Sequence, residues 1–95
     1  MVIIAGTIQM DPDKVADAMP AIVALMTATW AEDGCIDYVS SADPVRAGGI
    51  RIFEKWESDE ALAPHMAEFQ QKAGDFGITA MSVERFDGAT ASKLI

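Results

Sequence analysis

His65 is the only histidine in the chain, which makes it the first residue to consider for chemistry. An imidazole takes up and releases protons near neutral pH more readily than other side chains, so His65 is a candidate general base. The alternative interpretation is a hydrogen-bonded helix residue without a catalytic part. A histidine-cluster metal site is excluded by the count, and no metal-ligand spacing links the Asp, Glu and Cys residues, so we expect no bound metal.

Three further side chains are candidates for binding a substrate, each with a structural alternative. Trp56 offers a flat wall for an aromatic ligand and one N–H donor, and Tyr38 offers a phenolic donor; both residue types are also common in cores. Glu54 shares its strand face with Trp56, and a buried carboxylate there would need a partner or a raised pKa. For Glu54 we favour a structural ion pair with Arg51 or Arg85.

Composition and charge narrow the class of protein. The chain has 95 residues, of which 51% are hydrophobic and 23% charged, as expected for one globular domain over 1–95. Its net charge of −8 argues against binding nucleic acid or an anionic membrane. Cys35 is the only cysteine and we interpret it as a buried, inert thiol; no intramolecular disulfide is possible. With no signal peptide recognised at residues 1–6, the prediction is a cytoplasmic protein.

These side chains must be positioned by strands and helices that the pattern predicts in the order βαββαβ. Strands are expected over 2–9, 35–42, 50–57 and 78–87. A first helix is expected from an Asp11 cap to about residue 32, and a second from a Ser58 cap to the glycines at 74 and 77. Pro20 and Pro64 fall inside these helices and should kink them, or shift the start of the second.

The first helix carries an apolar stripe at three- and four-residue steps, formed by Val15, Met19, Ile22, Met26 and Trp30. Residues 18–31 carry no charge, but this run is shorter than the roughly 20 residues that cross a bilayer. One interpretation is a helix packed deeply on a sheet. The other is that Ala21, Ala24, Ala28 and Thr29 line a cavity.

Alternation assigns the faces of the strands. Ile36 and Tyr38 should share one face of the second strand, and Ile50, Ile52, Glu54 and Trp56 one face of the third. The resulting fold class is α+β and ferredoxin-like, a four-stranded antiparallel sheet with two helices on one face. The other face, which holds Phe53, then needs a cover, so we expect a homodimer.

The segment from Gly34 to His65 resembles the antibiotic biosynthesis monooxygenase-like family. The similarity lies in a glycine-led strand, a strand ending Phe53-Glu54-Lys55-Trp56-Glu57, and a capped helix carrying Ala61-Leu62 and then His65. Asp33 stands where this family usually has proline, and Pro64 also departs from its pattern. The resemblance implies a dimeric α+β barrel and a cofactor-independent monooxygenase that combines a small electron-rich aromatic, such as a quinol or polyphenol, with dioxygen. His65 and Trp56 would be catalytic, and the predicted substrate-binding residues are Tyr38, Glu54, Met26 and Trp30.

Two other functions are compatible with the same fold. A haem binder would carry an axial histidine late in the second helix, but no histidine follows Phe69. A non-enzymatic dimer that binds a small ligand is the main alternative to the enzyme.

Overall fold

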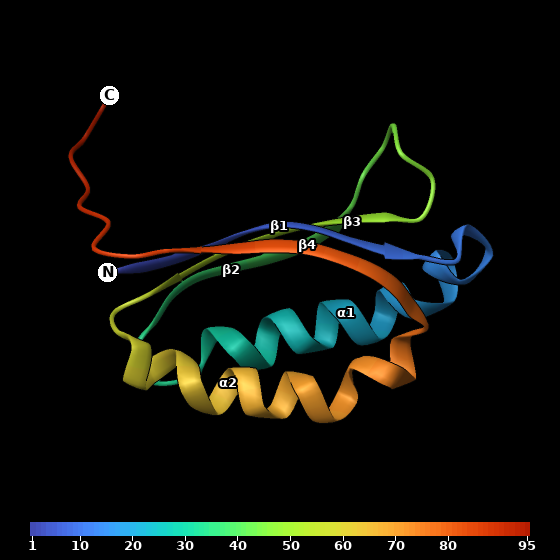
Figure 1. The fold of residues 1–95 in the computed structure, drawn as a ribbon, viewed down its shortest axis with the longest axis horizontal. Helices are drawn as coiled ribbons and strands as arrows, with labels where there is room; N and C mark the ends of the chain where they lie inside the picture. The colour runs from blue at the N-terminus through green and yellow to red at the C-terminus, as the bar shows by residue number, and fades with distance from the viewer.

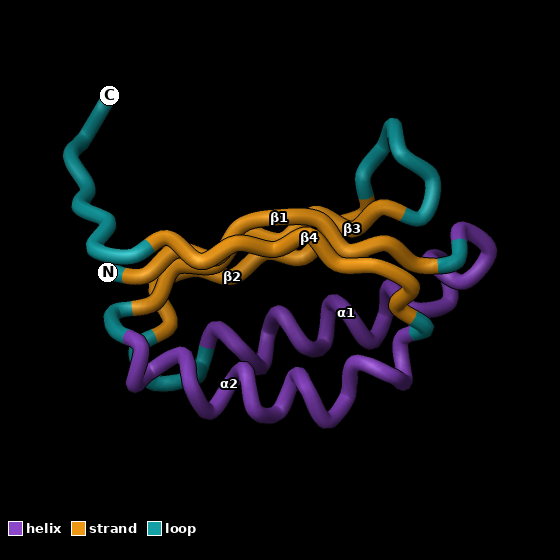
Figure 2. Tube along the Cα trace, in the orientation of Figure 1, coloured by secondary structure: helices purple, strands orange, loops and turns teal.

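The computed structural model describes residues 1–95, except for the side chains of Ala73 and Asp75. The chain runs through β1 (Val2–Met10), α1 (Val15–Trp30), β2 (Cys35–Ala42), β3 (Gly49–Trp56), α2 (Asp59–Lys72) and β4 (Ile78–Phe86), with short 3₁₀ helices at Pro12–Lys14 and Ala73–Phe76. The strands form one antiparallel sheet in the order β2-β3-β1-β4. Both helices lie side by side on one face of it (Figures 1 and 2). The predicted ferredoxin-like α+β fold is therefore confirmed.

The start of α2 follows the expected capping chemistry, whereas α1 starts later than expected. The Asp11 carboxylate accepts the backbone N–H of Asp13 at 2.9 Å, although Pro12 opens a 3₁₀ turn and the α-helix itself begins only at Val15. The Ser58 hydroxyl accepts the backbone N–H of Ala61 at 3.2 Å. Pro20 and Pro64 both lie within their helices, so Pro64 does not move the start of α2.

Gly34 brings the α1–β2 turn close to α2. Its φ of 82° lies in the left-handed region, and a Cβ at this position would overlap the side chain of Ala61 on α2. This close approach places the end of α1 beside the first turns of α2, where His65 lies.

The faces of β3 are as predicted, with Ile50, Ile52, Glu54 and Trp56 buried toward the helices. The prediction for β2 is wrong at Ile36, which is half-exposed while Tyr38 is buried. Cys35 pairs with Trp56 and Asp37 with Lys55, so Ile36 is the extra residue of a β-bulge. A bulge shifts the alternation by one residue, which a period-of-two pattern does not contain.

Most of the stripe predicted on α1 lies on its packed face, since Val15 and Met19 pack against the core and Ile22 belongs to it. Ile22 and Thr29 are the buried residues of α1, while Trp30 is 54% exposed. Ala21, Ala24 and Ala28 line a groove of about 360 Å³ between α1 and α2, as the second interpretation proposed, but Thr29 is not part of that lining. The helix is therefore not packed on the sheet across its whole uncharged surface.

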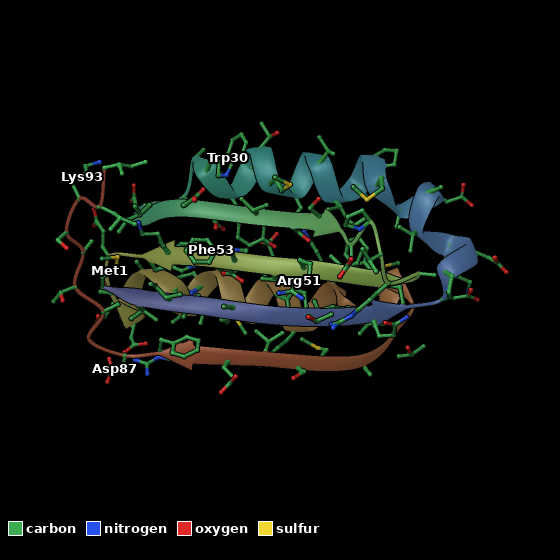
Figure 3. The ribbon with its side chains drawn as sticks, turned by 90° about the horizontal axis from the view of Figure 1, so that it is seen from above. Met1, Trp30, Arg51, Phe53, Asp87 and Lys93 are labelled. Atoms are coloured by element: carbon green, nitrogen blue, oxygen red, sulfur yellow. The ribbon has the colours of Figure 1, made fainter. Side chains whose placement is uncertain are left out.

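The core consists of two groups of buried residues between sheet and helices. One contains Ile8, Met10, Ile22, Ile50 and Ile52, and the other Val2, Ile4, Trp56 and Leu62. Glu54 lies on β3 between these groups. The opposite face of the sheet is not covered by any helix and carries the partly exposed side chain of Phe53 together with Arg51 (Figure 3).

Candidate functional site

His65 lies on the buried face of α2, and its residue surface is only 4% exposed. Leu62 precedes it by one helical turn and is also buried, so both side chains point from the same helix face toward the sheet. The imidazole is enclosed by two aromatic rings, with centroid distances of 5.2 Å to Tyr38 and 5.1 Å to Trp56. The neighbouring Pro64 does not turn His65 outward.

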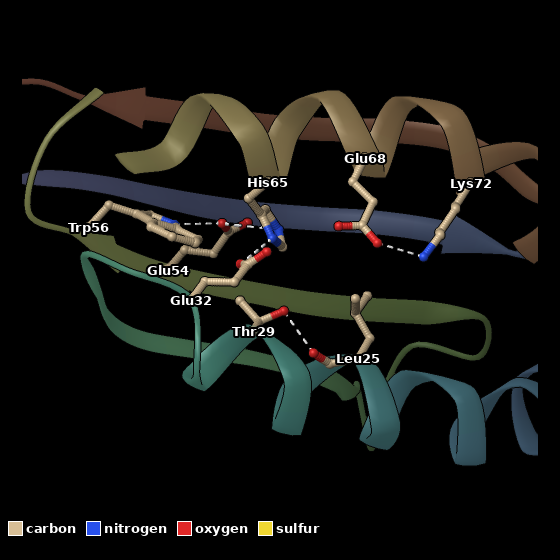
Figure 4. A network of polar contacts seen from close by, with 8 residues as sticks. All are labelled: Leu25, Thr29, Glu32, Glu54, Trp56, His65, Glu68 and Lys72. Carbon is tan, nitrogen blue, oxygen red and sulfur yellow. Dashed lines mark hydrogen bonds and ion pairs between the residues drawn. The ribbon is translucent and has the colours of Figure 1, made fainter. Parts of the chain in front are cut away.

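Each ring nitrogen of His65 faces a different carboxylate. Nδ1 lies 3.0 Å from Oε2 of Glu32, and Nε2 lies 3.8 Å from Oε1 of Glu54 (Figure 4). The same Oε1 accepts a hydrogen bond from the indole Nε1–H of Trp56 at 2.9 Å. The result is a chain of contacts from Trp56 through Glu54 and His65 to Glu32.

The arginine partners predicted for Glu54 are wrong, because its charged neighbour is His65. Arg51 lies on the uncovered face of the sheet, and Arg85 pairs instead with Asp59 and Asp87. Arg85 takes these partners because Asp59 opens α2 next to β4, whereas Glu54 points inward from β3.

The protonation of Glu54 is governed mainly by its burial. Removal from water raises the pKa of this carboxyl, while the hydrogen bond from Trp56 and the nearby His65 both oppose that rise. Glu32 adds a smaller like-charge effect in the upward direction. Glu54 is thus a buried acid whose charged form depends on the N–H of Trp56.

Glu32 is the site residue that sequence reasoning missed, because an acidic residue at the end of a helix is most often solvent-facing. Its side chain is 33% exposed and reaches across to α2. Its backbone N–H donates to Thr29 at 3.0 Å and its carbonyl accepts from Cys35 at 3.2 Å, which holds the turn in place. Glu32 and His65 are distant in sequence, and no motif in a single chain links them.

Tyr38 is buried, and its side chain faces both His65 and the cavity described below. Burial is the largest cause that raises the pKa of its phenol, followed by the charges of Glu54 and Glu32. The phenol therefore stays protonated at neutral pH and is available as a hydrogen-bond donor.

A cavity of about 300 Å³ lies between α2 and the sheet. Apolar residues of β1, β3, β4 and α2 form most of its walls, and polar or charged groups come from Tyr38, Glu54, His65, Glu84 and Arg85. This volume suits a small aromatic molecule. His65 also borders the groove between α1 and α2, so the imidazole lies in the wall that separates the two spaces.

Three of the residues predicted for the site do not line this cavity. Trp56 is fully buried and packs against the imidazole of His65 without lining the cavity. It is the last residue of β3 and lies under the first turns of α2. Trp30 donates its indole N–H to the backbone carbonyl of Tyr38 at 2.7 Å, so it holds β2 against α1 instead of contacting a ligand. Met26 on α1 is half-buried and is not among the residues that line this cavity.

Among the residues that the structure describes, no three acidic, histidine or cysteine side chains are arranged to hold a metal ion. Within the same part of the chain, no helix is both long and apolar enough to span a bilayer. Cys35 is partly buried beside Trp56 and not fully enclosed as expected, and burial raises the pKa of its thiol.

Comparison with solved structures identifies the same fold in several bacterial proteins. A candidate antibiotic biosynthesis monooxygenase from Deinococcus radiodurans superposes with a TM-score of 0.83 at 24% identity, over 100% of this chain and 99% of the other. A conserved protein of unknown function from Bacteroides thetaiotaomicron, named as a possible oxidoreductase, gives a TM-score of 0.74 at 26% identity, over 90% and 94% of the two chains. These similarities support the fold and leave the substrate open.

Sequence comparison identifies a relative and a family. An uncharacterized protein of Synechocystis sp. is 28% identical over 79 residues, which is 78% of this chain and 54% of the relative, so the chain spans about half the length of that protein. Residues 1–74 match the family model for antibiotic biosynthesis monooxygenases. The chain belongs to the antibiotic biosynthesis monooxygenase family.

Proposed function

We propose that this protein is a cofactor-independent monooxygenase that oxidises a small, electron-rich aromatic of the quinol or polyphenol class with dioxygen. The observation that carries the proposal is the buried imidazole of His65 in the wall of a largely apolar cavity of about 300 Å³. Family membership supports the reaction class.

The reaction needs a base and a dry pocket, and the substrate supplies the electrons. His65 removes a phenolic proton, and the resulting anion transfers an electron to dioxygen. A quinol that becomes a hydroxyquinone takes one oxygen atom into a C–O bond and releases the other as water, so its own oxidation supplies all the electrons that dioxygen requires. The apolar walls limit the contact of the radical pair with water.

Tyr38 and Glu54 take positioning roles in this proposal. The Tyr38 phenol, which is neutral at working pH, donates a hydrogen bond to a substrate oxygen. Glu54 lies beside Nε2 of the imidazole and stabilises the positive charge that His65 acquires when it takes the proton. Trp56 acts through Glu54 and the imidazole, without contacting substrate.

A homodimer is part of the proposal. The uncovered face of the sheet presents partly exposed apolar side chains, among them Val39, Phe53 and Phe86. A second copy that packs on this face would remove them from water, which is favourable by about 25 cal/mol per Å² of apolar surface. Each site lies on the helix side of its own sheet, so the pairing leaves the cavity described above in place.

The test is turnover of a panel of quinols under ¹⁸O₂. We expect one labelled atom in the product and one in water, and a loss of turnover of about 10²-fold or more for His65→Ala. His65→Asn is the control for shape, because its amide can still hydrogen-bond to Glu32 but cannot accept a proton at neutral pH. Retained turnover in His65→Asn would contradict a base role, and binding of quinols without any oxygen transfer would favour the ligand-binding alternative.

A further inference from the structure

The contacts of His65 distinguish its two ring nitrogens. A neutral imidazole carries one proton, on either Nδ1 or Nε2, and an ionised carboxylate can only accept. The separation of 3.0 Å between Nδ1 and Oε2 of Glu32 is that of a hydrogen bond, so Nδ1 is the nitrogen that donates. The separation of 3.8 Å between Nε2 and Oε1 of Glu54 is too long for one.

Glu54 does not compete for the imidazole proton. Its Oε1 already accepts the indole N–H of Trp56 at 2.9 Å, and this fixes the carboxylate beside β3. Nε2 therefore makes no protein hydrogen bond of normal length. It lies next to the carboxylate of Glu54, which helps to line the cavity, and so it faces that cavity.

The backbone of Glu32 is fixed in a position from which its carboxylate reaches Nδ1 of His65. Backbone hydrogen bonds to Thr29 and Cys35 fix its position in the α1–β2 turn, and the close approach of Gly34 to Ala61 fixes that turn against α2. The carboxylate thus meets Nδ1 from an element other than the helix that carries His65.

We propose that Glu32 is the positioning residue of this site: it keeps the proton on Nδ1 of His65 and leaves Nε2 as the atom that accepts the substrate's proton. The first half of the proposal stands on the contacts alone, and the second half rests on the proposed function. When Nε2 takes the proton, the imidazolium lies between the carboxylates of Glu32 and Glu54, which stabilise its charge.

The tautomer can be observed directly, because a single histidine produces a single set of imidazole signals. In long-range ¹H–¹⁵N NMR spectra recorded through a pH series, we expect the neutral form of the wild-type protein to carry its proton on Nδ1. In Glu32→Ala we expect the proton to move to Nε2, the position usual for histidine in water, from which it can turn toward Glu54. Glu32→Gln should retain the Nδ1 proton, since its amide oxygen still accepts.

Glu60→Ala is the matched control, because Glu60 is an exposed acid on α2 that is not part of the contacts of His65. It should leave the tautomer and the turnover unchanged. A neutral wild-type imidazole protonated on Nε2, or a Glu32→Ala spectrum that keeps the Nδ1 proton, would overturn the proposal. If Glu32→Ala does not fold, the wild-type and Glu32→Gln spectra still decide it.

Kinetics separate this proposal from the proposed function. With a quinol that is turned over, Glu32→Ala should lower kcat by about 10- to 100-fold with little change in KM, and Glu32→Gln should recover part of that loss. If no quinol is oxidised while the NMR result is as expected, the reaction is wrong and the positioning role of Glu32 stands. If turnover depends on His65 but neither kcat nor the tautomer depends on Glu32, the reaction stands and the positioning role is wrong.

Discussion

Replacement of Trp56 by Phe tests how strongly the indole N–H controls the buried carboxyl of Glu54. Trp56 is fully buried, and its Nε1–H donates to Oε1 of Glu54 at 2.9 Å. Phe retains an aromatic ring next to His65 but has no donor. The substitution therefore removes one hydrogen bond and leaves a small void where the larger indole lay.

The expected cost follows from these two losses. A hydrogen bond to a charged partner contributes about 1.5–3 kcal/mol to the free energy of unfolding, and one to a neutral partner about 0.5–1.5 kcal/mol. The void adds about 1 kcal/mol, as for other small truncations in a core. We expect Trp56→Phe to lower the free energy of unfolding by about 2.5–4 kcal/mol where Glu54 is ionised, and by about 1–1.5 kcal/mol less where Glu54 is protonated.

The direction of the pH dependence follows from the pKa of Glu54. The Trp56 hydrogen bond lowers that pKa against the effect of burial, so its removal raises the pKa of Glu54 in the folded protein further. When the pKa of a carboxyl is higher in the folded state than in the unfolded state, the free energy of unfolding falls as the pH rises. The fall extends from the ordinary carboxyl pKa to the raised one. The penalty of Trp56→Phe should therefore grow with increasing pH.

Urea unfolding followed by circular dichroism, from about pH 4 to about pH 8, measures this difference. Trp30→Phe is the matched control, because the N–H that it removes donates to the backbone carbonyl of Tyr38, which does not titrate. Its penalty should be independent of pH. A constant penalty for Trp56→Phe, or an equal pH slope in the control, would show that the hydrogen bond does not govern the ionisation of Glu54.

Three further variants test the core, the sheet and the assembly. Because burial raises the pKa of Glu54, Glu54→Gln should gain stability relative to wild type as the pH rises above about 4.5, and parallel unfolding curves across pH would contradict this. Gly6→Ala places a Cβ against the β4 backbone at Ser82, so we expect the free energy of unfolding to fall by about 1–3 kcal/mol. An unchanged unfolding midpoint would mean that β4 can shift away from the new methyl group at little cost. Phe53→Lys puts a charge on the uncovered face and should shift sedimentation from dimer to monomer, whereas a wild-type monomer at micromolar concentration would refute the dimer itself.

Patterns that repeat along the chain predicted the fold well. Period-two alternation identified the buried face of β3, Ser58 marked the start of α2, and Asp11 marked the 3₁₀ turn that precedes α1. These signals are local, since each depends on residues within one element. They fail where an element departs from its ideal period, as at the bulge around Ile36.

The candidate site shows the same difference between what local patterns predict and what they do not. From the sequence alone, His65 stood out by residue type, and Glu54 and Trp56 by their shared strand face. Only the tertiary structure shows that Trp56 packs against the imidazole and that Trp30 hydrogen-bonds to the backbone of β2. It also shows that Glu54 accepts a hydrogen bond from an indole and not from an arginine. It also brought Glu32 to Nδ1 of His65 from the turn that follows α1. The reason is physical: residue type and period specify which groups are buried, whereas the partner of a buried polar group depends on how separate elements meet, and that arrangement is set by packing across the whole molecule.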